Sequence, residues 1–207
     1  MPRGPVIGPM VIAGVVIEEE RLPSLSALGI KDSKQLTSKR REYLFDKIIK
    51  LVKNYKIIII PAEEIDQAIL SPKTNLNWLE SIKFAMVINY LKPDVAIVDC
   101  PSNNTRAYSE HLSAYLKDNV KLICENKADE NFVICSAASI LAKVTRDREI
   151  EKLKETYGQF SSGYPSDPIT KEFLKDKWDK HPEIFRKTWA PYKEVSQKKK
   201  QMNLGEF

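Results

Sequence analysis

The chain has 207 residues, of which 43% are hydrophobic and 29% are charged, and its formal net charge is +5 at pH 7. This length supports one full domain with a substantial core, and the composition is that of an ordinary globular protein. No apolar run reaches the roughly 18 residues that span a bilayer, and Gly8 and Pro9 interrupt the stretch that a signal peptide would need. We therefore expect a cytoplasmic protein without a membrane segment. The mild positive charge permits binding to a polyanion without requiring it.

Residue types with strong nucleophilic or metal-binding chemistry are scarce. The three cysteines, Cys100, Cys124 and Cys135, show no C-x-x-C pairing, so we expect reduced thiols. The sequence has only two histidines, which leaves little material for a Ser-His pair, a Cys-His pair or a histidine-rich metal site. Carboxylates are therefore the expected catalytic groups.

The hydrophobic pattern predicts one long strand followed by alternating helices and strands. The long strand bends at Gly8-Pro9, and the first helix begins at Thr37. Short connections between the elements predict a three-layer α/β domain with a mixed sheet over residues 1–192, and a basic flexible tail over 193–207. In chain order the predicted elements are a strand over 6–17, a helix over 37–52, a strand over 56–60, a helix over 75–91, a strand over 95–98, a helix over 104–116, a strand over 120–124, a helix over 137–157, a turn-rich loop over 161–168 and a helix over 169–180.

Two aspartates follow predicted strands. Asp99 ends an apolar strand, where ligands gather in open α/β sheets, but capping of the following turn explains it equally well. Asp129 lies between a strand and a long helix, where an acid is favoured by the helix dipole alone. Together the two carboxylates could share Mg²⁺ or Mn²⁺ and support metal-assisted phosphodiester hydrolysis, although such sites usually have more acids. An aspartyl-phosphate enzyme would need a D-x-D pattern, which V-D-C-P lacks.

Five motifs, in their order along the chain, resemble the ribonuclease HII family in its archaeal form. The similarity runs from Arg3 to about Tyr192. It implies the ribonuclease H fold, a mixed five-stranded sheet flanked by helices, with a helical C-terminal portion. It also implies an endonuclease that cuts the RNA strand of RNA–DNA hybrids and cuts 5′ to a single ribonucleotide in duplex DNA. The motifs occupy Arg3–Gly14, Lys31–Thr37, Val98–Ser102, Asn126–Asp147 and Ser162–Pro168.

The family site has four acids, of which the third matches Asp99 and the fourth matches Asp129. The first two belong to a D-E-A-G-R-G motif, whereas this sequence begins M-P-R-G. Met1 and Pro2 stand where the family has Ala and Gly, and the Asp-Glu pair and the strand before it are absent. We expect either a late start of the given sequence, which the intact remaining motifs favour, or a degenerate homologue that binds hybrids with severely weakened hydrolysis.

The resemblance also implies contacts with the substrate. In the family a Gly-Arg-Gly loop and a tyrosine read the ribose 2′-hydroxyl, the group that separates RNA from DNA. The alternative for the tyrosine is a ring that closes a loop over the core, and for the basic residues a solvated face. Phosphate contacts predict salt-sensitive binding. The matching residues are Arg3, Gly4 and Tyr164 for the ribose, Ser33 and Lys34 near the phosphates, and Lys143 and Arg146 as added positive charge.

The end of the chain carries a short box, Q-x-x-L-x-x-F, formed by Gln201, Leu204 and Phe207. Replication and repair proteins resemble one another in binding the sliding clamp through such a box. Leu204 and Phe207 are spaced one helical turn apart, which suits two apolar anchors in a groove. The alternative is an uninformative tail. We expect a monomer whose partners are an RNA–DNA hybrid or ribonucleotide-containing duplex and the clamp.

Overall fold

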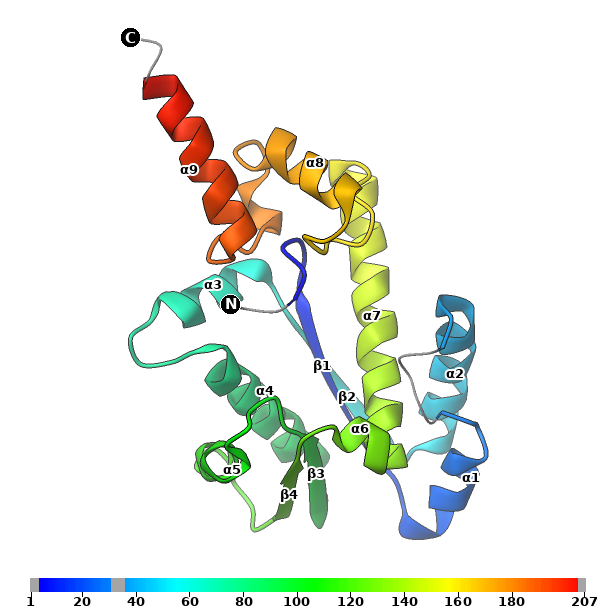
Figure 1. Ribbon diagram of the computed structural model, residues 1–207. Helices are drawn as coiled ribbons and strands as arrows, with labels where there is room; N and C mark the ends of the chain where they lie inside the picture. The colour runs from blue at the N-terminus through cyan, green and yellow to red at the C-terminus, as the bar shows by residue number, and fades with distance from the viewer. Residues whose placement is uncertain (1–3, 31–35, 205–207) are drawn as a thin grey trace. The chain divides into compact units, whose positions relative to one another are not determined.

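The structure is a computed structural model that describes residues 4–30 and 36–204, with residues 199–204 described by their backbone alone. Helices and strands alternate along the chain (Figure 1). The strands are β1 (Met10–Val16), β2 (Asn54–Ile60), β3 (Val95–Asp99) and β4 (Lys121–Glu125). The helices are η1 (Glu19–Arg21), α1 (Leu22–Ser26), α2 (Ser38–Leu51), α3 (Ala62–Leu70), α4 (Leu76–Leu91), α5 (Thr105–Ser113), α6 (Ala128–Asn131), α7 (Val133–Tyr157), α8 (Pro168–Lys177), η2 (Pro182–Ile184) and α9 (Ala190–Leu204).

The chain divides into two compact units. The sheet unit comprises the described residues of 11–59 and 76–145. The helical unit comprises the described residues of 1–10, 60–75 and 146–207. Helix α7 belongs to the sheet unit up to Thr145 and to the helical unit from Arg146 onward. The sequence predicted one domain over 1–192, and that boundary stays a prediction.

The strands of the described residues form two separate pairs, β1 with β2 and β3 with β4. The β3–β4 pair is parallel, with Val95 opposite Lys121 and Asp99 opposite Glu125. The resemblance implied one five-stranded mixed sheet, so this detail is corrected for residues 4–30 and 36–204. The physical reason is that their strand backbone groups bond within each pair, and no described strand joins the pairs.

The first predicted strand, over 6–17, begins later than expected. Strand β1 starts at Met10, and Ile7 forms an isolated antiparallel bridge with Phe185. Gly8 has a φ of +87°, which interrupts the extended backbone, and Pro9 has no N–H to donate. The bend at Gly8-Pro9 was therefore predicted correctly, but it separates two segments with different partners.

Helix α2 begins where the sequence predicted it. The Thr37 side chain accepts a hydrogen bond from the Arg40 N–H at 3.2 Å, which satisfies one of the donors that a helix start leaves open. Leu44, Phe45 and Ile48 of α2 are buried. The apolar face that the sequence indicated thus packs into the core.

The end of the chain differs from the prediction. The sequence predicted a flexible tail from residue 193, whereas α9 continues to Leu204. The long polar residues after Lys193 are good helix formers, and no Gly or Pro interrupts them before Gly205. The backbone of 193–204 is thus helical, and the flexibility of the tail stays a prediction. No helix in the described part of the chain is both long and apolar enough to cross a membrane.

Two apolar clusters form the core of the sheet unit, in keeping with a layered α/β fold. One cluster joins β1 to α1, α2 and α7, through residues such as Ala13, Leu44 and Ile140. The other joins β3 to α4 and α5, through residues that include Val98 and Tyr108. Helices therefore cover strands in both halves of this unit, as the alternating pattern of elements predicted.

Gly14 determines how closely α4 approaches β1. A Cβ atom added at Gly14 would lie 2.4 Å from Val87 Cγ1 and 3.2 Å from Leu91 Cδ1. Val87 is 3% exposed, so it has little room to move away. The absence of a side chain at Gly14 is therefore a packing requirement rather than a backbone one.

We expect Gly14→Ala to lower the free energy of unfolding by about 1–3 kcal/mol, because the new methyl overpacks a tight contact. Chemical denaturation measures this change. The matched double variant Gly14→Ala/Val87→Ala removes the opposing methyl groups and should recover part of the loss beyond the sum of the single effects. Purely additive single effects would contradict a direct steric clash.

Candidate functional site

Asp99 is placed by the end of strand β3. The side chain of Val98 is buried and that of Asp99 is exposed, as strand alternation requires. Asp99 Oδ1 accepts a hydrogen bond from the Ala128 N–H at 3.0 Å. Ala128 is the first residue of α6, so the carboxylate lies at the N-terminus of that helix. Asp99 therefore ends a strand, as the sequence indicated, and it accepts from the start of a helix that is distant in sequence, which neither interpretation included; its role as a ligand stays a prediction.

The loops after β3 and β4 are tied together by backbone and amide groups. The Cys100 N–H donates to the Glu125 carbonyl at 2.9 Å. The Asn126 side-chain amide donates to the carbonyls of Cys100 at 2.6 Å and Ser102 at 2.8 Å. Lys127 then adopts a left-handed conformation with φ +59° before α6 begins. These contacts fix the V-D-C-P-S and N-K-A-D motifs against each other.

Asp129 is the second residue of α6 and is 9% exposed. Its backbone carbonyl accepts a hydrogen bond from the Ser136 hydroxyl, which lies in α7. Ala128 therefore connects the two acids, since its N–H binds Asp99 and its carbonyl carbon leads into Asp129. The structure therefore links the two predicted site residues, Asp99 and Asp129, through Ala128 within the sheet unit.

The thiol of Cys135 lies near the carboxylates of Asp99 and Asp129. Burial raises the pKa of Cys135 to about 12, and the negative charges of Asp99, Asp129 and Glu125 act in the same direction. Cys135 Sγ is 3.6 Å from the Ile97 carbonyl, to which it donates. A thiol with such a high pKa is neutral near pH 7, so carboxylate oxygen is the chemistry that the site offers to a cation.

The other two cysteines follow the same trend. Burial is the largest cause that raises the pKa of Cys100 and of Cys124.

Within residues 4–30 and 36–204, no group of three or more His, Cys, Asp or Glu side chains has an arrangement that could hold a metal ion. The described part of the site thus supplies Asp99 and Asp129 as candidate ligands.

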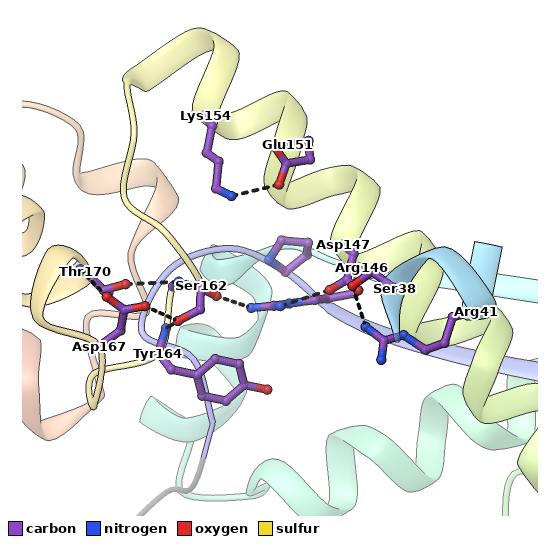
Figure 2. A network of polar contacts seen from close by, with 12 residues as sticks. Ser38, Arg41, Arg146, Asp147, Glu151, Lys154, Ser162, Tyr164, Asp167 and Thr170 are labelled. Carbon is purple, nitrogen blue, oxygen red and sulfur yellow. Dashed lines mark hydrogen bonds and ion pairs between the residues drawn. The ribbon is translucent and has the colours of Figure 1, made fainter. Parts of the chain in front are cut away.

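The predicted ribose-reading tyrosine, Tyr164, lies in the helical unit, and Figure 2 shows its surroundings. The Tyr164 side chain is 43% exposed, which suits a stacking surface. The Arg146 guanidinium lies over its ring, 5.2 Å from the ring centre. Arg146 also donates to the Ser162 carbonyl at 2.6 Å and pairs with Asp147 at 3.2 Å. These contacts within the chain place Arg146 against the ring of Tyr164 and the loop before it.

The loop before α8 is organised by one carboxylate. Asp167 accepts hydrogen bonds from the hydroxyls of Ser161 at 2.7 Å and Ser162 at 3.0 Å. It also accepts from the N–H groups of Ile169 and Thr170 at the start of α8. These bonds, the Ser161 hydroxyl first, lower the pKa of Asp167 to about 2. Asp167 therefore fixes both the loop that carries Tyr164 and the helix that follows.

Gly163 connects this loop to the N-terminal segment, which we define as residues 4–9. The N–H groups of Val6 and Ile7 donate to the Gly163 carbonyl at 2.8 Å and 3.3 Å. Gly163 has a φ of +77°, and a Cβ there would lie 3.1 Å from the Ile7 carbonyl oxygen. Both the backbone angle and the close approach require glycine. The segment that carries Gly4 and the loop that carries Tyr164 are therefore bonded directly.

The remaining predicted residues are placed as follows. Lys143 is half-buried on α7, in the sheet unit. Gln201 and Leu204 lie in the backbone of α9. Arg3, Ser33, Lys34 and Phe207 lie outside the described residues. The roles that the resemblance assigns to them stay predictions.

Two residues with clear structural roles were not singled out in the sequence. Asn126 lies inside a matched motif, but its bonds to Cys100 and Ser102 cross between loops. Arg186 is 4% exposed, and only its position between Phe185 and Trp189 could have indicated burial. A charged residue inside an aromatic run must find partners when it is buried.

Solved structures of ribonucleases resemble this fold over most of its length. The ribonuclease H2 from Pyrococcus horikoshii OT3 matches with a TM-score of 0.86 at 43% sequence identity, covering 96% of this chain and 94% of that chain. A chain in the PCNA:RNase HII complex from Archaeoglobus fulgidus matches with a TM-score of 0.82 at 38% identity, covering 90% of each. The fold is therefore that of the ribonuclease H2 class, which confirms the predicted α/β fold.

Sequence comparison narrows the class further. The family model described as Ribonuclease HII matches residues 2–192. The Ribonuclease HII of Pyrococcus abyssi is 46% identical over 207 residues, covering 98% of this chain and 91% of that protein. The chain belongs to the ribonuclease HII family, as the five motifs indicated.

The pKa of Asp167 gives a pH-dependent prediction. A carboxylate whose folded pKa lies near 2, against an ordinary value of 3.8, stabilises the fold above pH 3.8, and this contribution is lost as pH falls through 2. We expect Asp167→Asn to melt at a lower temperature than the wild type at pH 5, because the amide bears no charge. The difference in Tm should shrink steadily between pH 4 and pH 2 in thermal melts. A constant difference would show that the Asp167 charge is not the cause.

Proposed function

We propose that this chain is an endonuclease that cuts the RNA strand of RNA–DNA hybrids and cuts 5′ to a single ribonucleotide in duplex DNA. The observation that carries the proposal is the arrangement of Asp99 and Asp129, which are joined through Ala128 at adjacent strand ends. Family membership supports it, because both acids lie in motifs that match the family. Removal of misincorporated ribonucleotides during replication and repair is the corresponding biological role.

In this proposal Asp99 and Asp129 are the ligands for Mg²⁺ or Mn²⁺, which prefer carboxylate oxygen. A bound cation supplies a nucleophilic water and stabilises charge on the phosphate. Asp99 is exposed to substrate and has one carboxylate oxygen oriented by the Ala128 N–H. Asp129 is set back in a more buried position by α6 and α7. The protein thus orients the first acid by hydrogen bonding and the second by helix packing.

Recognition of the ribose is assigned to Gly4 and Tyr164, together with Arg3. Gly4 has a φ of +145°, a region that favours glycine and brings its backbone groups close to a ligand without a side chain between them. Tyr164 presents an exposed ring whose outward face suits a sugar or base. Lys143, Ser33 and Lys34 add the phosphate contacts in this proposal.

A second candidate is a homologue that binds hybrids but does not cut them. It is favoured by the count of acids, since the described residues include no group of three or more potential metal ligands. This candidate predicts salt-sensitive binding to hybrids at any metal concentration without product formation. The two candidates therefore differ in cleavage and agree in binding.

We expect the wild type to cut a labelled duplex with one ribonucleotide when Mg²⁺ or Mn²⁺ is present, and chelation to stop the reaction. Asp99→Asn and Asp129→Asn should each lower kcat/KM by about 100-fold or more, because loss of a metal ligand removes several kcal/mol of transition-state stabilisation. Gel analysis of the product measures the rate and the position of the cut.

Asp94→Asn is the matched control, since Asp94 is an exposed acid just before β3, at the opposite end of the strand from Asp99. It should keep wild-type activity. Binding of the hybrid without cleavage in either metal would favour the second candidate. Equal rates for the wild type and Asp99→Asn would exclude Asp99 as a ligand.

We also propose that the C-terminal box binds the sliding clamp. The solved PCNA:RNase HII complex from Archaeoglobus fulgidus contains a relative of this chain, which supports the assignment. Helix α9 carries the backbone in helical form to Leu204, the first of the two apolar residues of the box. The lysines at 198–200 precede the box and suit an acidic rim on a partner.

A peptide of residues 198–207 should bind a PCNA-type clamp with a Kd in the micromolar range, because two apolar anchors bury a small area. Isothermal titration measures the affinity. Leu204→Ala should weaken binding by at least about tenfold in the peptide and in the full chain, whereas Asn203→Ala, at a position between Gln201 and Leu204, should leave it unchanged. Absence of binding at high micromolar concentration would remove the clamp from the proposal.

A further inference from the structure

Arg186 is a buried cation that lies between η2 and α9 in the helical unit. Its side chain is 4% exposed. Its Nε donates to the Gly8 carbonyl at 3.1 Å, and its Nη2 donates to the Pro9 carbonyl at 2.9 Å. The guanidinium also lies 5.0 Å from the ring centre of Trp189, which is 1% exposed. A planar guanidinium that donates to two successive carbonyls and lies over an aromatic ring is fixed in one position by these contacts.

The same residue contacts the N-terminal segment at two further points. The Arg186 N–H donates to the Val6 carbonyl at 2.9 Å. A Cβ built at Gly4 would lie 3.5 Å from Arg186 Nη1, so the guanidinium reaches the backbone at Gly4. Arg186 therefore contacts the segment near its start, its middle and its end.

The segment is also bonded to the loop that carries Tyr164. The N–H groups of Val6 and Ile7 donate to the Gly163 carbonyl. The Gly8 N–H donates to the carbonyl of Ile184, in η2, at 2.9 Å. Figure 2 shows Tyr164 beside Ser162 of the same loop, which accepts from Arg146 through its carbonyl and donates to Asp167 through its hydroxyl. Arg186 and the loop that carries Tyr164 thus both bond the N-terminal segment.

Burial of a guanidinium is costly, and its neutral carbonyl acceptors offset that cost only while the segment keeps its path. The guanidinium therefore restrains the path of the segment at Gly8 and Pro9, and it lies next to the backbone at Gly4.

We propose that Arg186 is a positioning residue for ribose discrimination, acting by fixing the N-terminal segment so that the Gly4 backbone stands at the sugar beside Tyr164. This inference rests on the proposed function. Arg186 does not touch the substrate in this account. It sets the location of the backbone groups that do.

The test compares binding to two duplexes that differ only in one 2′-hydroxyl, measured by fluorescence anisotropy in chelator so that no cleavage occurs. The discrimination ratio is the Kd for the all-DNA duplex divided by the Kd for the duplex with one ribonucleotide. We expect Arg186→Met to lower this ratio by about tenfold, mainly by weakening the ribonucleotide complex. Arg186→Lys keeps the charge but not the fork, and should lower it by roughly threefold.

Asp66→Asn is the matched structural control. Asp66 in α3 is 6% exposed and accepts from the Lys187 N–H at 2.7 Å and the Thr188 N–H at 2.9 Å. The variant disturbs the residues next to Arg186 without removing a donor to the N-terminal segment. It should lower Tm and leave the discrimination ratio at the wild-type value. Should Arg186→Met not fold, Arg186→Lys carries the comparison with the same control.

Each outcome decides the inference. A ratio that falls for the Arg186 variants and not for Asp66→Asn supports it. An unchanged ratio for the Arg186 variants overturns it, and so does an equal fall for Asp66→Asn. A wild type that cleaves in Mg²⁺ but shows no preference in chelator overturns this inference alone, whereas a wild type that neither binds nor cleaves ribonucleotide-containing duplexes overturns the proposed function.

Discussion

The hydrogen bond from the Ala128 N–H to Asp99 determines the geometry of the candidate active site. It joins the end of β3 to the start of α6, and the residue after Ala128 is Asp129. The contact can form because Lys127 turns the chain with a left-handed φ and Asn126 bonds both neighbouring carbonyls. A carboxylate at a helix N-terminus is favoured by the helix dipole, so the same feature that stabilises α6 also orients a candidate ligand.

Periodicity and end signals in the sequence predicted much of the sheet unit. The strand that ends at Asp99 and the Thr37 cap follow from local patterns, and both lie where the sequence placed them. Long-range bonds were not predictable in this way. Nothing local to Arg186 shows that its partners are Gly8 and Pro9, because those bonds join residues about 180 positions apart. Helix α3, which carries Asp66, was also missed, since Pro61 starts it without a side-chain cap.

The two predicted parts of the site depend on different kinds of support. In the sheet unit, Asp99 accepts from a backbone N–H at the start of α6, and the backbone of Asp129 accepts from the Ser136 hydroxyl of α7. In the helical unit, irregular segments lie against each other, and glycine at Gly163 permits the contact. Irregular segments hold their shape only when their backbone groups find partners. This need explains why one buried arginine and one aspartate, Asp167, take part in so many of the bonds there.

The three cysteines have a consequence for the handling and the chemistry of the protein. Burial raises the pKa of Cys100, Cys124 and Cys135 alike. Oxidants and alkylating reagents attack the thiolate rather than the thiol, and the thiolate is scarce in this chain at neutral pH. Alkylating reagents should therefore modify the three thiols more slowly in the folded protein than in the unfolded one.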